Sequence, residues 1–318
     1  MPSRSFPVLI LGGGPAGMTA AIQLRRYGIP ALLIEKTRLG GLLWNANLVE
    51  NYPGFPAGVS GPKLVHLIEK QMERLDAQVT FDEVTQISQE GGGFQVTTIT
   101  NYYLPWFVIV ASGTKPNPIS LPIPAKIQNR VFSEVYPLLG VTGKRVVIVG
   151  AGDAAFDYAL NLSKNGNFVT ILNRGQAVKC LPLLRERAAA QASIATFDGK
   201  PVSRVEAGGA ADRLIVRCAA GESFEAEYLL FATGRQPELG FFPDQDEVRR
   251  TLLNGVFPDE EIGRLSGLSH AERCDAPSAP ENLFFAGDVK NGLFRQAAIA
   301  AGDGLRAAMQ IYFKLEKA

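Results

Sequence analysis

The sequence predicts an α/β fold of two similar units, the second inserted into the first, each with a parallel sheet between two other layers. Three observations predict this class. Two glycine-rich segments, 12–17 and 150–155, each follow an apolar run and precede a helical pattern. The apolar run ending at Ala111 recurs as the run ending at Thr233, so the order of elements repeats. A last apolar run, 283–286, returns the chain to the first unit.

The elements of the first unit follow from the period of the apolar residues. Short unbroken apolar runs predict buried strands, and apolar residues three and four positions apart predict helices. Alternating residues on both sides of Gly91-Gly92-Gly93 predict a hairpin. In chain order we expect a strand at 8–11, a helix at 18–27, a strand at 31–34, a helix at 64–75, strand-like segments over 79–100, and strands at 107–111 and 283–286 before a helix at 297–315.

The second unit repeats this order after a proline-rich segment, 116–124, which we expect to link the units. Its elements are a strand at 146–149, a helix ending near 162, and strands at 168–172 and 229–233. The expected domains are 1–119 together with 236–318, and 120–235.

The composition is that of a globular protein, with 318 residues, 46% of them hydrophobic, and with 32 basic and 31 acidic side chains. A formal charge of +1 offers no basic field, so we expect neither nucleic acid nor an anionic membrane as a partner. Met1–Phe6 is too short and polar for a signal peptide, and no apolar run reaches the roughly 18 residues of a membrane span. We therefore expect a cytoplasmic protein. The cysteines and histidines show no metal-ligand spacing.

Both glycine-rich segments have the pattern of a dinucleotide-binding turn, which makes the two units Rossmann-like. Such a turn lets the backbone approach a pyrophosphate, and it directs the positive end of a helix at the negative charge. Glu35 ends the second strand, where an acidic side chain accepts hydrogen bonds from an adenosine ribose. Two turns of this kind in one chain predict an oxidoreductase that uses two nucleotides.

Further motifs over nearly the whole chain resemble those of the low-molecular-weight thioredoxin reductases, FAD-dependent pyridine nucleotide-disulfide oxidoreductases, and of the thioredoxin-reductase-like ferredoxin-NADP reductases. The motifs are Gly12–Gly17, Gly40-Gly41, Val49–Gly54, Ala111–Gly113, Gly150–Ala155, Ala232–Gly234, Ala286–Val289 and Arg295–Ala297. The resemblance implies FAD in the first unit and NADPH in the inserted one. It also implies a homodimer and a redox protein partner of the thioredoxin or ferredoxin type.

The resemblance implies an FAD site assembled from both ends of the chain. Asp288, at the end of a strand, is placed to accept from a ribitol hydroxyl, and the helix that follows Gln296 directs its positive end at the flavin. Taken alone, Gly287-Asp288 also fits a turn at a strand end. The expected FAD residues are Gly12, Gly14, Pro15, Ala16, Gly17, Glu35, Lys36, Gly41, Leu42, Asn51, Ala111, Gly113, Gly287, Asp288, Arg295, Gln296 and Ala297.

The redox dithiol of the thioredoxin reductases is missing from this sequence. Its two cysteines fall on Ser133-Glu134-Val135-Tyr136, and neither a hydroxyl nor a phenol replaces a thiolate at neutral pH. Thioredoxin reduction through that site is therefore excluded. Tyr136 is a candidate to shield or stack on the flavin, and a core-facing aromatic in a turn is the alternative.

The three cysteines leave one candidate for thiol chemistry. Cys180 stands beside Lys179, whose charge is expected to lower the pKa of the thiol. Cys218 lies in a strand pattern, and Cys274 lies in a long insertion at 238–281. The alternative is that all three are unpaired structural cysteines. Two charged pieces of the insertion, 246–253 and 260–265, are candidates to cover a cofactor or to bind a partner. The alternative is that they are surface segments without such a role.

The resemblance places the second nucleotide on the inserted unit. The expected residues are Gly150, Gly152, Asp153, Ala154, Asn173, Arg174 and Lys179. The family's basic cluster for a 2′-phosphate keeps only half its charge here, while Asn173 is expected to accept from a plain ribose. NADPH, NADH, a second FAD and an empty site remain open.

Four functions follow from these expectations. The leading one is an FAD-dependent oxidoreductase that passes electrons between flavin and a second nucleotide, a protein carrier or a disulfide. The second is an enzyme similar to the diflavin-linked disulfide oxidoreductases, with a second FAD in the NADPH site. The third is a ferredoxin-NADP reductase. The fourth is a flavin-binding sensor without turnover.

Overall fold

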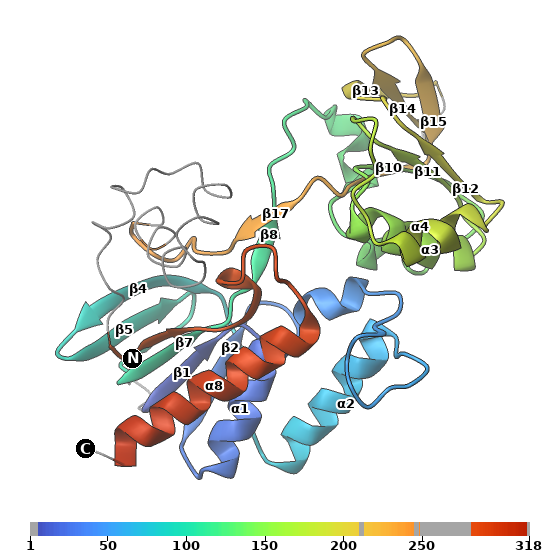
Figure 1. Ribbon diagram of the computed structural model, residues 1–318. Coiled ribbons are helices and arrows are strands. Elements are labelled where there is room, and N and C mark those ends of the chain that lie inside the picture. The colour runs from blue at the N-terminus through green and yellow to red at the C-terminus, as the bar shows by residue number, and fades with distance from the viewer. Residues whose placement is uncertain (1–5, 210–212, 245–247, 249–280, 317–318) are drawn as a thin grey trace, which may run out of the picture. The chain divides into compact units, whose positions relative to one another are not determined.

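A computed structural model describes residues 6–209, 213–244, 248 and 281–316 (Figure 1). The chain divides into two compact units. The discontinuous unit comprises Met1–Trp44, Glu50–Lys115 and Gln236–Ala318, and the inserted unit comprises Asn45–Val49 and Pro116–Arg235. The charged pieces expected at 246–253, apart from Val248, and at 260–265, together with Cys274, lie outside the described residues.

The centre of the discontinuous unit is a five-stranded sheet in which all neighbouring strands run parallel. In spatial order its strands are β18 (Leu283–Phe285), β7 (Phe107–Val110), β1 (Val8–Leu11), β2 (Ala31–Glu35) and β3 (Gln78–Phe81). Every residue of β1 and β7 is buried, because the sheet is covered on both faces.

The two faces of this sheet carry different layers (Figure 1). The helices are α1 (Pro15–Arg26), α2 (Gly61–Arg74) and α8 (Ala297–Glu316). The antiparallel strands of the other layer are β4 (Val84–Glu90), β5 (Gly93–Thr98) and β6 (Tyr102–Tyr103). Leu9 and Leu11 pack with Ile87 and Phe94 of the antiparallel layer, while Ile10 faces α1, as alternation along a strand requires.

The inserted unit repeats this plan. Its parallel sheet runs, in spatial order, β12 (Ile194–Phe197), β11 (Phe168–Leu172), β10 (Arg145–Val149), β16 (Tyr228–Phe231) and β9 (Val131–Phe132). One face packs against α3 (Asp153–Lys164) and α4 (Pro182–Ala189). The other packs against the antiparallel strands β13 (Val202–Ala207), β14 (Leu214–Cys218) and β15 (Ser223–Ala226).

Short elements complete the two units. They are the 3-10 turns η1 (Gly41–Asn45), η2 (Ala125–Arg130), η3 (Tyr136–Leu138) and η4 (Gly287–Val289), and the paired strands β8 (Thr114–Pro116) and β17 (Arg235–Pro237). Among the described residues, none of the helices combines the length and apolar character needed to cross a bilayer.

The predicted α/β class with two Rossmann-like three-layer units is confirmed. The repeat is visible in four neighbouring strands of each sheet, β7-β1-β2-β3 and β16-β10-β11-β12, whereas the fifth strand, β18 or β9, comes from a different place in the order of the chain. The hairpin expected around Gly91-Gly92-Gly93 is confirmed, because β4 and β5 pair antiparallel on either side of these glycines. The start of the strand-like region 79–100 is not part of this hairpin, since β3 joins the parallel sheet beside β2. The helix expected from 18 begins at Pro15, since proline is well suited to the first turn of a helix.

Candidate functional site

The first glycine turn requires glycine at Gly12 and Gly17 and leaves space at Gly14. Gly12 has a φ of +109°, and a Cβ there would lie 2.4 Å from the carbonyl oxygen of Ala111. A Cβ at Gly17 would lie 1.9 Å from the carbonyl oxygen of Gly12. Gly14 caps α1 and has no atom within 4 Å of its own Cβ position. The turn therefore holds α1 tightly against β1 and leaves an open approach to the start of the helix, which suits a pyrophosphate.

The second glycine turn has the same geometry. Gly150 has a φ of +116°, and a Cβ there would lie 2.3 Å from the carbonyl oxygen of Ala232. Gly152 caps α3 as Gly14 caps α1. Ala155, fully buried, takes the place of the third glycine. The expected residues Gly150, Gly152, Asp153 and Ala154 thus all lie at the turn and the start of α3.

Glu35 binds the backbone of the first glycine turn. Its Oε2 accepts from the N–H of Gly13 at 2.7 Å, and its Oε1 accepts from the N–H of Thr37 at 2.9 Å. A carboxylate has further acceptor sites after these bonds, so Glu35 keeps capacity for a ribose hydroxyl. Lys36 was also expected to contact the cofactor, but its amine pairs with Glu83 at 2.6 Å and is mostly exposed.

The loop that follows β2 lies over the first glycine turn. The N–H of Gly40 donates to the carbonyl of Gly13 at 2.7 Å, and a Cβ at Gly41 would lie 3.2 Å from the Cα of Gly14. Trp44 stabilises the loop, because its indole N–H donates to the carbonyl of Leu39 at 2.6 Å. The structure therefore brings Gly41, at the start of η1 with Leu42, to the glycine turn, as expected for cofactor residues.

The C-terminal part of the chain reaches the same turn. A Cβ at Gly287 would lie 2.9 Å from the Cβ of Ala16, and Gly287 begins η4, which contains Asp288. Asn51 and Gln296, distant in sequence, are joined by a hydrogen bond of 2.7 Å from the Asn51 amide. Gln296 directly precedes Ala297, the first residue of α8. These expected FAD residues are therefore assembled in one unit.

The sequence prediction missed Asp303 of α8. Its carboxylate is 8% exposed and accepts from the N–H of Gly287 at 3.1 Å and from the Asn291 amide at 2.7 Å. The amine of Lys290 lies 3.2 Å from its second oxygen. Asp303 thereby holds η4 and the loop after it against α8. An acidic residue on the apolar side of a predicted helix was the available signal.

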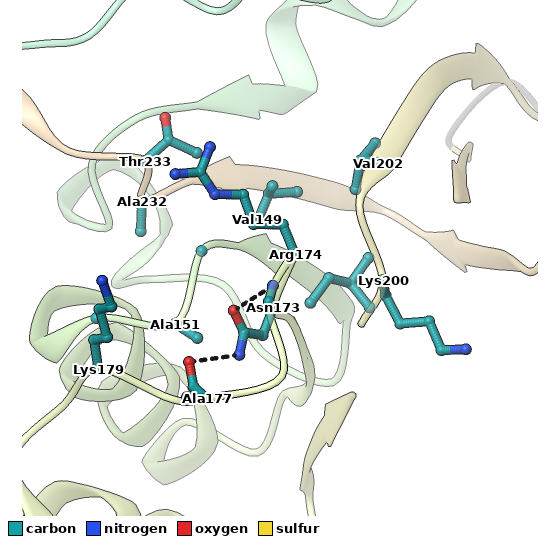
Figure 2. A pocket seen from close by; sticks show the side chains of 14 residues that line it. Val149, Ala151, Asn173, Arg174, Ala177, Lys179, Lys200, Val202, Ala232 and Thr233 are labelled. Atoms are coloured by element: carbon teal, nitrogen blue, oxygen red, sulfur yellow. Dashed lines mark hydrogen bonds between the residues drawn. The ribbon is translucent and has the colours of Figure 1, made fainter. Parts of the chain in front are cut away.

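A pocket of about 500 Å³ lies within the inserted unit, over the second glycine turn (Figure 2). Its walls come from the turn, the end of β11, the loop after it and the segment after β12. Arg174 and Lys179, both expected, line it and are exposed. In the part of the chain that the structure describes, no carboxylate pairs with either side chain. The pocket therefore offers two cations beside a helix start, a suitable environment for phosphate.

The side chain of Asn173 stabilises the loop that follows β11. The side chain is 7% exposed, and its Oδ1 accepts from the N–H of Gly175 at 3.1 Å. Its amide donates to Asp198 at 2.8 Å and to the carbonyl of Ala177 at 3.2 Å. These bonds shape the loop that carries Arg174. The acceptor role toward a ribose therefore stays a prediction.

The segment 133–136 contains polar contacts in place of thiols. Val135 is fully buried, and the carboxylate of Glu134 pairs with Arg235 at 3.0 Å. The N–H of Tyr136 donates to the side chain of Asn45 at 3.0 Å within the inserted unit. The ring of Tyr136 is half-buried, and its role beside a flavin stays a prediction.

The expected activation of Cys180 is wrong. Burial raises the pKa of its thiol, the charge of Asp153 raises it further, and Arg185 opposes both only in part. Burial, with the charge of Glu222, likewise raises the pKa of Cys218, which lies inside β14. Both cysteines are free. Neither has the lowered pKa of a nucleophilic or redox thiol.

One carboxyl of the inserted unit titrates near neutral pH. Burial raises the pKa of Asp157, on α3, to about 6. The N–H of Asn47, which donates to it at 2.9 Å, and the charge of Lys164 lower it only in part. Burial also raises the pKa of the neighbouring Tyr158 to about 12.

Known proteins share this architecture and part of its sequence. The family model for pyridine nucleotide-disulphide oxidoreductases matches residues 6–304. The thioredoxin reductase of Streptomyces coelicolor is 31% identical over 313 residues, which cover 95% of this chain and 91% of that protein. The thioredoxin reductase of Treponema pallidum is 28% identical over 308 residues, covering 95% of both. The crystal structure of Lactococcus lactis thioredoxin reductase has a TM-score of 0.81 at 24% identity, covering 98% of this chain and 100% of that one, and shows the common fold. The chain therefore belongs to the pyridine nucleotide-disulphide oxidoreductase family, in its thioredoxin-reductase-like branch, and is an FAD-dependent oxidoreductase.

Proposed function

We propose that this oxidoreductase carries electrons from NADPH to a disulfide on a partner protein without an internal dithiol. The observation that supports this most is the combination of a phosphate-suited pocket with the absence of any pair of cysteines two residues apart. NADPH gives up a hydride, which is two electrons and one proton, and becomes NADP⁺. The partner's disulfide takes up the two electrons with two protons, one of them from water, and becomes two thiols.

FAD occupies the discontinuous unit in this proposal. The open space at Gly14 and the anchored carboxylate of Glu35 fit its pyrophosphate and adenosine ribose. Asp288 and Gln296 would hold the ribitol and flavin end. When bound there, FAD supplies an isoalloxazine that takes up and releases the two electrons. The protein's own part is to orient this cofactor and to exclude water from it.

The nicotinamide nucleotide occupies the inserted unit. Its pyrophosphate would lie at Gly152 and the start of α3, and its 2′-phosphate would lie between Arg174 and Lys179. Charge-assisted hydrogen bonds contribute about 1.5 to 3 kcal/mol when buried, and less at exposed side chains such as these. We therefore propose a preference for NADPH that is moderate and depends on salt concentration.

The decisive experiment is an anaerobic reductive titration that counts electrons per FAD. We expect NADPH to bleach the yellow flavin absorbance with uptake of two electrons per FAD, since no internal disulfide accepts more. Uptake of four would reveal a redox-active cysteine pair and contradict the proposed route. No bleaching by NADPH, with bleaching by dithionite, would contradict NADPH as donor.

The same preparation distinguishes the remaining alternatives. Release of two flavins per denatured chain would indicate a second FAD, an option that the comparisons do not support. Reduction of ferredoxin but of no disulfide would indicate a ferredoxin-NADP reductase. A colourless protein that takes up no FAD would remove the FAD assignment. A flavin-loaded protein without turnover toward disulfides or carriers would indicate a sensor.

We also propose that the protein is a homodimer. Leu305, Met309 and Phe313 follow each other at intervals of four residues on α8 and are 38%, 42% and 53% exposed. Apolar side chains in such a row are typical of a covered helix face. Light scattering after gel filtration tests this, and replacement of Met309 and Phe313 by Glu is expected to give a monomer that retains FAD.

A further inference from the structure

A third basic residue lines the nucleotide pocket, but its charge is directed elsewhere. Lys200 follows β12, and its N–H donates to the carbonyl of Asn173 at 2.8 Å, so its backbone lies next to the loop that carries Arg174. Figure 2 shows the guanidinium of Arg174 and the amine of Lys179 on the side of the pocket toward Thr233, whereas the amine of Lys200 points away from them.

The partner of the Lys200 amine is Glu222, at the turn between β14 and β15. The amine donates to Oε1 of this carboxylate in a close ion pair. The hydrogen bond from Lys200 lowers the pKa of Glu222, so the carboxylate is charged at neutral pH. Its second oxygen is buried and has no hydrogen-bond partner among the described residues. Lys200 is therefore the contact that compensates this charge, and both side chains are partly shielded, at 25% and 39% exposure.

We propose that Glu222 sets the nucleotide specificity of this pocket by holding the amine of Lys200 away from the 2′-phosphate position. The inference rests on the proposed function, because it assumes that the pocket receives a nucleotide. The stem of Lys200 lines the pocket, and lysine has a long flexible chain, so rotation about its side-chain bonds brings the amine toward Arg174. Glu222 prevents this rotation and thereby reduces the discrimination between NADPH and NADH.

The test uses ligands that differ only in the group of interest. Isothermal titration calorimetry on the full-length, FAD-loaded protein compares 2′,5′-ADP with 5′-AMP at low ionic strength. The variants are E222Q, K200M and their combination. The matched control is E225Q, which removes a carboxylate from the adjoining strand, β15, where it pairs with Arg213 at 3.1 Å and not with Lys200.

We expect E222Q to bind 2′,5′-ADP about five- to tenfold more tightly than the unmodified protein, the range of an added partly exposed ionic contact. Binding of 5′-AMP is expected to stay unchanged, because it lacks the 2′-phosphate. K200M alone is expected to give no gain in affinity for 2′,5′-ADP, because the charge of Glu222 then lacks its compensating amine, and E225Q is expected to behave like the unmodified protein. The gain is expected to disappear in E222Q/K200M.

Three results would overturn the inference. An unchanged affinity of E222Q for 2′,5′-ADP would show that Lys200 does not enter the pocket when released. A gain that persists in E222Q/K200M would assign it to the lost negative charge and not to Lys200. A gain in 2′,5′-ADP affinity in K200M alone would show that tighter binding does not need the amine of Lys200.

Failure of the proposed function gives a different pattern. If R174M binds 2′,5′-ADP as tightly as the unmodified protein, the 2′-phosphate does not occupy the proposed position. The 2′,5′-ADP affinity of E222Q still tests whether Glu222 holds the amine of Lys200 away from the ligand. If the unmodified protein binds neither ligand, binding of 2′,5′-ADP by E222Q supports the inference, and absence of binding overturns it.

Discussion

The N–H of Gly287 donates a hydrogen bond of 3.1 Å to the carboxylate of Asp303, whose second oxygen lies 3.2 Å from the amine of Lys290. This bond connects α8 to the turn that carries Asp288. Because Asp303 also binds Asn291, one buried carboxylate organises the whole loop beside the first glycine turn. Its removal is therefore expected to affect FAD through the shape of the loop.

Asp303→Ala is expected to lower the free energy of unfolding by about 2 to 4 kcal/mol, because buried donors and the Lys290 charge lose their acceptor. FAD is also expected to dissociate more readily during gel filtration. Asp303→Asn retains one acceptor oxygen, so its stability and its FAD retention are expected to lie between those of Asp303→Ala and of the unmodified protein. Gln310→Ala, at an exposed position of the same helix, is the control. Equal FAD retention in Asp303→Ala and the control would contradict the positioning role.

Gly12→Ala and Gly14→Ala are expected to separate folding from cofactor binding. At Gly12 the new Cβ meets the Ala111 carbonyl at 2.4 Å in a backbone conformation that disfavours alanine, so we expect a loss of at least about 2 kcal/mol in unfolding free energy. At Gly14 the space is open, so stability of the FAD-free protein should hold. There we expect weaker FAD binding, because the methyl group occupies the approach to the helix start. Denaturant titration and FAD titration of the apoprotein measure the two effects.

Arg174→Met and Lys179→Met are each expected to raise the Michaelis constant for NADPH about five- to tenfold and to leave that for NADH unchanged. The reason is that both cations line the pocket and have no acidic partner in the described chain. Arg185→Met, exposed on α4 and outside the pocket lining, is the control. Equal losses with NADPH and NADH would place these side chains at a shared part of the two nucleotides.

Asp157 predicts a pH dependence of stability. Its pKa is raised in the folded state to about 6 from the ordinary value of 3.8, so the folded state binds the proton more tightly than the unfolded state. The proton on Asp157 therefore stabilises the folded state most below about pH 4. This stabilisation is lost as the pH rises through about 6. Asp157→Asn is expected to remove this pH dependence of stability and to raise the free energy of unfolding at pH 7 by about 1 to 3 kcal/mol. Unfolding titrations of both proteins from pH 4 to 7 measure the difference, and parallel curves would contradict it.

Cys180 is expected to react slowly with iodoacetamide at pH 7. Because burial and Asp153 raise its pKa, less thiolate is present than in an ordinary cysteine. Mass spectrometry of the peptide that contains Cys180 follows the rate, with glutathione as the reference. Cys180→Ser is expected to keep full turnover. Faster alkylation than glutathione, together with loss of turnover in Cys180→Ser, would restore Cys180 as a redox residue.

Local patterns predicted the glycine turns and the strands that lead into them. A short apolar run followed by glycines at fixed spacing leaves few backbone choices, and strands at 8–11 and 168–172 were placed within their observed bounds. The antiparallel layers were predicted less well. The residues of β13 alternate irregularly between buried and exposed, and β15 has only four residues, so neither strand gives a strong period of two.

The residues missed by the sequence prediction act through contacts distant in the chain. Asp303 meets a loop that precedes its own helix, and Lys200 meets Glu222 across β13 and β14. The pKa of Cys180 was predicted in the wrong direction because its neighbour in sequence, Lys179, counts for less than burial and Asp153. Charge and burial depend on distance in space, which adjacency in sequence does not measure.

The amino-acid sequence by itself determined the α/β class, the two glycine turns, the acidic end of β2 and the absence of a closely spaced pair of cysteines, because each depends on residue identity over a short stretch of chain. Only the tertiary structure decided which cations line the inserted unit's pocket, which carboxylate diverts Lys200 from it, and which buried acid supports the turn at Gly287. These are properties of side chains brought together by packing, and their direction, shielding and partners arise when the layers close around the sheets.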